Sequence, residues 1–457
     1  MKSKFLTAIA VAFLPVLVSA TLFSSVLAVK ADTTSGDWEG ANASGAIVKG
    51  EDSPVIVEKE TLDFHIASLP REGKVESGYT SEAVAEYVFY NPTEDDYDMT
   101  LLFPFGVFPS YVASNATDEI SAVSVGGESA ECRVRHSYAS STFSAEKDIE
   151  RVLDEKKADA FYGESTPVNE YRIILAPNQK REGGTLNLKL SYNPRRTRII
   201  FPTEGTRLYV SGGDMYATVP LEDNSSSILF YAFGAPIFQV SSAGKEEVSP
   251  LEPAVTEMTF ARFAMMGWSA GMGVSEVDWY NAVVDMLNDK NVSAGATDAF
   301  GFTSKNLMRW YEYDMKIPAG ERVVSRVKTP LYPTVEGNKN PRYEYSYLLS
   351  PAAKWADFQS LEICIKTPYL LASGSLNFTK EQVGDGYAYS FTRSSLPQGE
   401  LTFVLMESED ADSDFNVFDR SFLRPSTTWA FVTLTCLAGV ATVITVVAIV
   451  TFKKKNR

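Results

Sequence analysis

The chain has 457 residues, of which 45% are hydrophobic and 22% charged, and its 58 acidic and 42 basic residues give a net charge of −16. An acidic surface makes nucleic acid and anionic lipid headgroups poor partners, whereas cations and basic polymers are tolerated. Two histidines and three cysteines make a zinc site improbable.

The first 31 residues have the composition of a secretory signal peptide. Lys2 and Lys4 precede a long apolar run, and small residues lead to a cleavage point after Ala31. Cleavage after Ala20 and an uncleaved anchor are the alternatives. We predict residues 1–31 as the signal peptide and the small, polar residues 32–52 as a linker.

From about residue 54 to residue 406 apolar and polar residues alternate in short runs separated by turn residues, the pattern of half-buried strands. The alternation is clearest at 83–89, 185–192, 197–201, 309–317, 321–328, 342–349, 360–366 and 400–405. The 22 Tyr and 27 Phe residues suit antiparallel sheets. We predict a mainly β (α+β) fold with two β-sandwich-like antiparallel lobes, 53–205 and 206–406.

One inserted helix is expected in each lobe. The first, 145–161, follows a Ser cap at 144 and has Ile149, Val152, Leu153 and Ala160 on one face. The second, 276–290, is opened by Ser275 with Asp278 three residues later, which is the spacing of a capping box. Its apolar stripe consists of Val277, Tyr280, Val284 and Leu287.

The stretch AEYVFYNPTEDDYDMTLLFPFG, residues 85–106, places acidic residues beside two apolar runs: Glu86, Glu94, Asp95, Asp96 and Asp98. A calcium loop of the helix–loop–helix type needs Gly at its sixth position and Glu at its twelfth. Counted from Asp96, these positions hold Leu101 and Val107. We therefore predict a solvated hairpin turn rather than a metal or catalytic site.

The Tyr-Asn-Pro sequence at 90–92 occurs again at 192–194. The first copy leads to LLFP at 101–104 and the second to IIFP at 199–202. Proline cannot donate a hydrogen bond to a β-ladder, so it stops a strand wherever it falls. The same hairpin pattern, a strand stopped by proline and followed by a turn, explains both copies. Internal duplication is the alternative.

Two catalytic motifs are matched in part. Gly267 to Gly271 fits the nucleophile elbow around Ser269, but the general-base histidine of that motif must follow the serine, and His65 and His136 both precede it. His65 is interpreted as a strand residue.

The S-x-x-K motif of penicillin-binding enzymes occurs at Ser144 to Lys147 and at Ser242 to Lys245. Ser375-Leu376-Asn377 fits the second part of that pattern, but no K-T-G follows. The related triplets at 328–330 and 366–368 come earlier and have Pro in place of Gly. No catalytic, cofactor-binding or metal-ligating residue is therefore predicted, and the chain is predicted not to be an enzyme.

Residues 429–452 are 24 residues without a charge, about 36 Å as a helix, which predicts a transmembrane span. The basic tail 453–457 marks the cytoplasmic side. Residues 407–428 form an acidic stalk, and its alternating Asp410, Asp412 and Asp414 allow weak calcium binding. Without the seven basic residues at the two ends, the extracellular part carries a net charge of −23.

Cysteine is scarce, because Cys436 lies in the predicted span and only Cys132 and Cys364 remain outside it. An extracellular domain of this size in an animal would carry several disulfides, so the scarcity indicates a Gram-positive bacterium with a single membrane. Glycosylation sequons mildly favour an animal extracellular protein instead. The sequence has five, at Asn42, Asn115, Asn224, Asn291 and Asn377.

Residues 83–104, a strand, an Asn-Pro turn and a strand that ends in Phe103-Pro104, resemble the first hairpin of vault/inter-α-trypsin-type (VIT-like) domains, and 123–134 resemble the next hairpin. That resemblance implies a β-rich interaction module. The rest, including 348–365, is similar to uncharacterised exported proteins of Gram-positive bacteria with a signal peptide and one C-terminal span. No functional residue follows from either resemblance.

These features together predict a single-pass cell-membrane protein whose bulk is extracellular. The expected function is non-catalytic interaction with a protein or the cell wall, and no cofactor is expected. Two alternatives are a cell-wall-directed hydrolase that uses acidic residues, and an accessory subunit of a membrane complex. A groove with two carboxyl groups about 5–10 Å apart would favour the hydrolase.

Overall fold

The computed structural model describes residues 42–49, 53–70, 81–109, 111–112, 123–139, 148–175, 184–203, 205–221, 227–243, 248–289, 304, 307–336 and 341–408. The predicted signal peptide, span and cytoplasmic tail lie outside these residues, as do most of the linker and stalk. Within the described residues, no helix has the length and apolar character that a membrane crossing needs.

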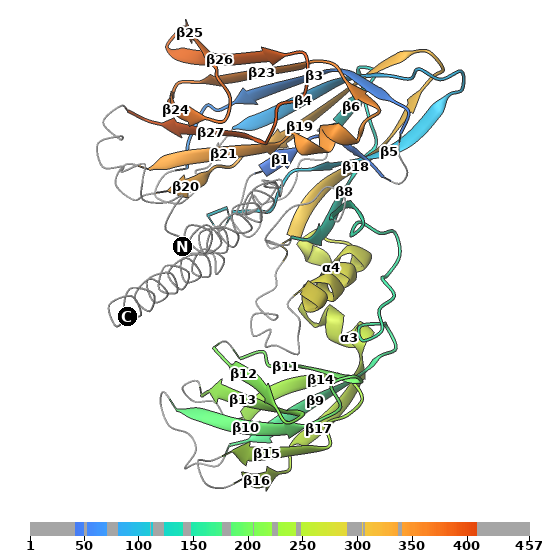
Figure 1. Cartoon of the computed structure of the whole chain (residues 1–457), viewed down its shortest axis with the longest axis vertical. Coiled ribbons are helices and arrows are strands. Elements are labelled where there is room, and N and C mark those ends of the chain that lie inside the picture. Colours follow the sequence, from blue (N-terminus) through green and yellow to red (C-terminus); the bar gives the residue numbers. More distant parts are fainter. Residues whose placement is uncertain are drawn as a thin grey trace, which may run out of the picture. The chain divides into compact units, whose positions relative to one another are not determined.

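The prediction of a mainly β fold with several antiparallel sheets is confirmed, and the described residues contain two α-helices, one of which was predicted (Figure 1). All eight segments with clear alternation are strands. The largest sheet in the described part of the chain has the strand order β25 (Thr379–Val383), β26 (Gly386–Arg393), β23 (Leu361–Thr367), β3 (Ile56–His65), β4 (Glu82–Tyr90), β19 (Arg322–Pro330), β6 (Val123–Val125) and β7 (Glu128–Ser129), with β22 (Asp357–Phe358) beside β3.

Two smaller sheets pack against this large sheet. One has the order β1 (Asn42–Ser44), β21 (Arg342–Leu348), β27 (Leu401–Met406) and β24 (Leu370–Gly374), with β20 (Thr334–Glu336) on β21. The other has the order β2 (Ile47–Val48), β5 (Tyr97–Pro104), β18 (Leu307–Ile317) and β8 (Cys132–Tyr138). One cluster of buried side chains, including Phe89, Phe103, Tyr311 and Phe403, joins all three sheets into a sandwich.

Residues 167–259 form a second pair of sheets, which we name the inserted module. One sheet has the order β12 (Arg207–Ser211), β13 (Asp214–Pro220), β10 (Thr185–Ser191), β15 (Gln239–Ala243) and β16 (Val248–Leu251). The other has the order β11 (Thr197–Ile200), β14 (Ser227–Gly234), β9 (Pro167–Ile174) and β17 (Ala254–Thr259). Leu188, Leu190, Phe201 and Phe230 belong to the core between them.

The strand pairing differs from the predicted division at residue 205. β3 pairs with β23, β4 with β19 and β5 with β18, so strands from both predicted lobes share sheets. The inserted module crosses the predicted boundary, because β10 pairs with β13. The β3–β23 pair is also parallel. Alternation shows which face of a strand is buried, but it does not show which strand lies beside it.

The predicted second helix is present as α4 (Glu276–Asp289). A short helix, α3 (Phe260–Ala264), precedes it, followed by the 3₁₀ turns η2 (Met265–Gly267) and η3 (Ala270–Met272). A further 3₁₀ turn, η7, covers Ser350–Lys354. Both α-helices share a buried cluster with Tyr231 and Phe233 of β14, and Tyr138 of β8 and Leu307 of β18 belong to the same cluster.

The prediction of a helix at 145–161 is wrong for the described residues of that range. Only Asp148 and Ile149 are helical, and residues 152–161 are turns and irregular chain. Val152 is buried, as its apolar position suggested. The backbone of 153–157 is instead held by α4: Asn281 Nδ2 donates to the carbonyl of Glu155 at 3.0 Å, and Asn281 Oδ1 accepts from the N–H of Lys157 at 2.7 Å. These tertiary contacts override the local helical pattern.

The acidic stretch 91–96 is a turn, but it does not close a hairpin. β4 belongs to the large sheet and β5 to the β2-β5-β18-β8 sheet, so the turn connects two layers. Asn91 is fully buried in it and donates from Nδ2 to the carbonyls of Asp95 and Ile317 at 2.8 and 3.0 Å. The second Tyr-Asn-Pro copy also connects two layers, since β10 and β11 belong to opposite sheets of the inserted module. The repeated sequence therefore marks the same kind of connection twice.

Candidate functional site

The first turn of α4 places a carboxylate inside the protein. Ser275 Oγ accepts a hydrogen bond from the backbone N–H of Asp278 at 3.0 Å, which caps the helix. The Asp278 side chain is only 1% exposed and accepts from the backbone N–H of His136 on β8 at 2.9 Å. The N-terminal end of α4 is thereby fixed to β8.

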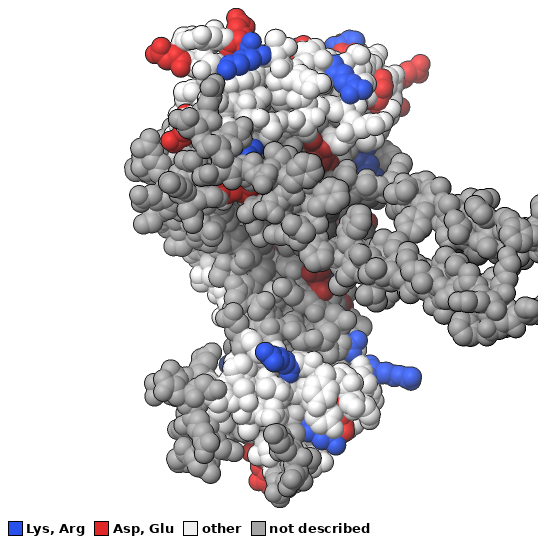
Figure 2. Space-filling view, turned by 60° about the vertical axis from the view of Figure 1, so that its left-hand side comes forward, with Lys and Arg blue, Asp and Glu red and all other residues white. Residues whose placement is uncertain are grey.

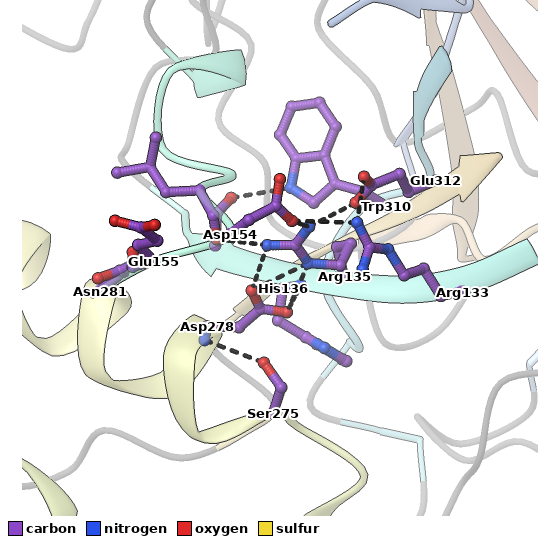
Figure 3. A network of polar contacts seen from close by, with 12 residues as sticks. Arg133, Arg135, His136, Asp154, Glu155, Ser275, Asp278, Asn281, Trp310 and Glu312 are labelled. Carbon is purple, nitrogen blue, oxygen red and sulfur yellow. Dashed lines mark hydrogen bonds and ion pairs between the residues drawn. The ribbon is translucent and has the colours of Figure 1, made fainter. Parts of the chain in front are cut away.

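Arg135 is the centre of the polar contacts in Figure 3. Its Nε and Nη2 both donate to Asp278, at 2.9 to 3.2 Å. Its Nη1 donates to Glu312 of β18 and to Asp154, and Nη2 also reaches the carbonyl of Leu153. This buried guanidinium therefore binds acceptors from α4, β18 and the 153–157 segment at once, as its planar fork of donors permits.

Two more cations complete the cluster. Lys49 Nζ lies 2.9 Å from Asp154 and 3.2 Å from Glu312. Arg133 Nη2 lies 3.0 Å from Asp154 and 2.6 Å from Glu312. We name these two cations, Arg135, Asp154, Asp278 and Glu312 the Arg135 network. Its three positive and three negative charges balance.

Contacts within the Arg135 network shift the pKa values of its members in the direction that keeps them charged. Burial alone would lower the pKa of Arg135, but hydrogen bonds and charge attraction from Asp278 and Glu312 raise it overall. Burial acts to raise the pKa of Glu312, but the guanidinium groups of Arg133 and Arg135 lower it overall. The hydrogen bond from Lys49 is the largest influence that lowers the pKa of Asp154. All three groups therefore stay charged near neutral pH.

The Arg135 network is suited to holding structure rather than to catalysis. Each carboxylate already accepts bonds from at least one cation, and the charges cancel. A catalytic acid or nucleophile needs an open face toward substrate, whereas Asp278 and Arg135 are buried on all sides. The network holds α4 and the 153–157 segment against the β2-β5-β18-β8 sheet.

An open pocket of about 670 Å³ lies beside the network on the same sheet. Its polar lining consists of Lys49, Asp98, Thr100, Asp314 and Lys316. Lys49 is engaged by the network, Lys316 lies 2.8 Å from Asp96 outside the lining, and Thr100 donates to Asp314 at 2.6 Å. On the face drawn in Figure 2, acidic and basic side chains of the described residues lie interspersed rather than in a large patch of one sign.

A second buried carboxyl lies in the core of the sandwich. Glu60 is fully buried on β3, and its Oε1 accepts from the Tyr347 hydroxyl at 3.2 Å. The Tyr347 and Tyr87 hydroxyls lie 3.0 Å apart. Burial raises the pKa of Glu60 to about 7, and its hydrogen bonds with the two tyrosines oppose part of that rise. Within the described residues, Glu60 Oε2 has no hydrogen-bond partner.

The outer face of the β12-β13-β10 sheet carries a pair of stacked rings. Tyr209 and Tyr216 are cross-strand neighbours whose ring centroids lie 4.8 Å apart with an interplanar angle of 6°. Tyr209 is 60% exposed. On the same face Lys189 lies opposite Tyr216, and Asn187 lies opposite Thr218. We name this surface the tyrosine face.

Most of the large exposed apolar side chains of the described residues belong to the inserted module. Among the described residues, five of the eight large hydrophobics that stand out as exposed belong to it: Ile174, Tyr209, Val210, Phe238 and Val255. The first sandwich, with more strands, contributes only Val324 and Val383 to this group. They lie on both sheets of the module, Ile174 and Val255 on β9 and β17 and Tyr209 and Val210 on β12, so the module as a whole exposes more large apolar side chains than the first sandwich.

The residues of the acidic turn do not converge on one site. Asp96 pairs with Lys316 and accepts from the N–H of Ala319, Asp98 lines the pocket, and Glu86 lies on β4 opposite Arg326 of β19. Among the described residues, no group of three or more His, Cys, Asp or Glu side chains could hold a metal ion. The stalk residues Asp410, Asp412 and Asp414 lie outside the described residues.

The partial catalytic motifs are distributed over separate elements. Ser269 lies just before η3, and His136 lies on β8 in contact with Asp278. Ser375 Oγ accepts from the backbone N–H of Thr402. Ser144, Lys147 and Lys245 lie outside the described residues.

Cysteine and the other histidine hold ordinary strand positions. Cys132 on β8 and Cys364 on β23 are both free thiols and lie in different sheets. His65 ends β3 and pairs with Glu82 of β4, as its interpretation as a strand residue predicted.

The Arg135 network was not predicted from the sequence. A weak signal was present, because RVRH at 133–136 and YEYD at 311–314 put charged residues on strands whose neighbours are apolar. That signal could not show that Arg135, Glu312 and the first turn of α4 meet, because Asp278 is 143 residues and Glu312 is 177 residues from Arg135 in the sequence.

Comparison with known proteins gives no family. No family model and no curated protein matches the chain. One similar solved structure is a protein of Legionella pneumophila named as a candidate nutrient binding protein, with 8% identity and a TM-score of 0.34 over 80% of this chain and 71% of that one. Another is the N-terminal domain of the Streptococcus gordonii adhesin Sgo0707, with 8% identity and a TM-score of 0.13 over 84% and 89%. Similarities this low carry no conclusion, and the VIT-like resemblance stays a prediction.

Proposed function

We propose that the chain is a non-catalytic surface protein, anchored by residues 429–452 with its bulk outside the cell, and that the inserted module contacts a cell-wall or protein partner. The observation that carries this proposal is the concentration of exposed apolar side chains on the module, including Phe238 at 71% exposure. Anchoring and orientation rest on the apolar run 429–452 and the basic residues that follow it.

The non-catalytic part of the proposal is supported by how the charged groups are used. The buried charges of the Arg135 network are paired with one another, and the serines and histidines of the partial motifs lie on separate elements. A contact protein needs a rigid framework that presents exposed residues, and the network supplies part of that rigidity by fixing α4 to β8.

A cell-wall-directed hydrolase is the second candidate, and one observation favours it. Asp98 and Asp314 both line the 670 Å³ pocket, and they are diagonal neighbours on paired strands, because Asp98 lies opposite Lys316 and Thr100 opposite Asp314. Diagonal neighbours lie about 7–8 Å apart, with their Cβ atoms somewhat closer, so the two side chains are close enough for their carboxyl groups to reach the roughly 5–10 Å separation of a catalytic pair. Both side chains are exposed, whereas a general acid is usually buried among apolar groups.

The experiment is photo-cross-linking in intact bacteria that make the full chain with a photoreactive amino acid at position 238 or, as the matched control, at Val383 of the first sandwich. A cross-linked wall fragment or protein at 238 but not at 383 is expected. Equal yields at both positions, or no product at either, would contradict the contact role. In parallel, the purified full chain in detergent is incubated with peptidoglycan. Release of soluble fragments that Asp98→Asn and Asp314→Asn each abolish would establish the hydrolase instead.

A further inference from the structure

The tyrosine face combines an aromatic platform with paired polar groups. Tyr216 covers one side of the Tyr209 ring, and the 60% exposure of Tyr209 leaves much of the ring open to solvent. Aromatic faces carry partial negative charge and attract the weakly positive C–H groups of a flat ring placed over them. The platform therefore has the shape and polarity to stack against a sugar ring.

Polar side chains lie in rows on both sides of the tyrosine pair. Asn187, Thr218 and Arg207 are cross-strand neighbours in one row. Ser191, Asp214 and Ser211 form the other row. β12 is the edge strand, and Arg207 and Ser211 lie on it two residues to either side of Tyr209, about 7 Å along the strand. Their guanidinium and hydroxyl groups are therefore the members of the two rows nearest to a saccharide stacked on the open side of Tyr209.

The charges on this face are mostly neutralised within it. Lys189 Nζ lies 2.9 Å from Asp214 Oδ2, and Thr218 Oγ1 donates to Asn187 Oδ1 at 2.7 Å. The hydrogen bonds with Lys189 and Ser191 lower the pKa of Asp214, so this pair stays ionised and mutually bound. A face with paired charges and fixed polar groups matches an uncharged, hydroxyl-rich ligand better than an ionic one.

We propose that the tyrosine face binds a polysaccharide, with one sugar ring stacked on the open side of Tyr209 and its hydroxyls bonded to Arg207 and Ser211. This rests on the proposed contact function and names the ligand class of the inserted module. A peptide partner is disfavoured because Val210, the apolar neighbour of Tyr209 on β12, points to the opposite side of the strand, so the apolar area on this face is limited to the two rings.

The test uses the full chain purified in detergent, with insoluble peptidoglycan and chitin for sedimentation and a soluble chitin oligosaccharide for titration. We expect Tyr209→Ala to weaken saccharide binding by at least about tenfold, the loss of one stacked ring. Tyr209→Trp should retain binding. Val383→Ala, which removes an exposed apolar side chain of the first sandwich, should bind as the unsubstituted chain does, and all variants should unfold at the same temperature.

Absence of binding to all three probes by the unsubstituted chain would overturn the proposal, as would equal binding by Tyr209→Ala. Binding of a peptide that is lost with Tyr209→Ala would also overturn it, in favour of a protein partner. The contact function itself is tested separately, by the cross-linking at position 238. If position 238 cross-links but no saccharide binds, only the polysaccharide proposal is contradicted. If neither result is obtained, the proposed contact function is contradicted as well.

Discussion

Arg135 and Asp278 form a buried ion pair in which two nitrogens of the guanidinium donate to one carboxylate, at 2.9 to 3.2 Å. Asp278 belongs to the first turn of α4 and Arg135 to β8, so the pair joins a helix to a sheet across 143 residues of sequence. Replacing Asp278 with Ala leaves the buried guanidinium with less compensation. We expect a loss of about 3–5 kcal/mol in the free energy of unfolding, measured by denaturant titration.

The matched control for this pair is Glu276→Ala, in the same helical turn but exposed to solvent. Its loss should be below about 1 kcal/mol, since only a favourable interaction with the helix dipole is removed. Equal effects of the two substitutions would mean that the Arg135 network does not hold α4 in place.

Glu60 predicts a specific dependence of stability on pH. The folded protein keeps the Glu60 proton up to a pKa of about 7, whereas the unfolded chain releases it near 4.5. The folded state therefore binds more protons between these values, so the Glu60 contribution to stability is present below pH 4.5 and is lost as pH rises to 7. The shift corresponds to about 3 kcal/mol.

The measurement compares denaturant midpoints of the unsubstituted chain and Glu60→Gln between pH 4.5 and 8. Because other groups also titrate, the informative quantity is the difference between the two curves, which should widen toward pH 7 in favour of Glu60→Gln and then level off. Glu58→Gln, on the same strand but paired with Arg322 at the surface, should follow the unsubstituted chain. Parallel curves for Glu60→Gln would show that Glu60 is not protonated in the folded state.

We expect Asn→Ala substitutions at the two Tyr-Asn-Pro connections to lower the free energy of unfolding by different amounts. Asn91 is fully buried and its Nδ2 satisfies carbonyls of two segments, while its Oδ1 accepts from Thr93. Asn193 is less buried, and its Oδ1 accepts from the N–H of Arg195. Asn91→Ala should therefore cost about 2–3 kcal/mol, because buried carbonyls lose their donor. Asn193→Ala should cost about 1 kcal/mol. Thermal unfolding of both variants tests the order, and a larger effect at Asn193 would refute this explanation of the repeat.

Local patterns in the sequence predicted the elements well where packing agrees with them. Alternation at 309–317 found β18, and the capping spacing of Ser275 found α4 within one residue of its C-terminal end. The apolar periodicity at 149–160 predicted a helix that is absent, because hydrogen bonds from Asn281 hold that backbone in another conformation.

Local sequence patterns could not predict which distant strands pair. The sequence predicts a hairpin at the Asn-Pro turn after β4 because adjacent strands often pair, yet β4 pairs with β19, whose residues come more than 200 positions later. The same limit hid the Arg135 network, which exists only once β8, β18 and α4 are brought together. Extended pairing of this kind is fixed by the summed burial of both sheet faces and not by any short segment.

The orientation of the chain is the claim on which the contact function depends most. The direct measurement is protease treatment of intact protoplasts that make the full chain with an epitope tag after Arg457, followed by detection of the tag. We predict that the full-length band is lost and that a short tagged fragment containing residues 429–457 remains, protected by the membrane. A full-length band that survives in intact protoplasts but is cleaved after detergent lysis would place the bulk inside the cell and contradict the account.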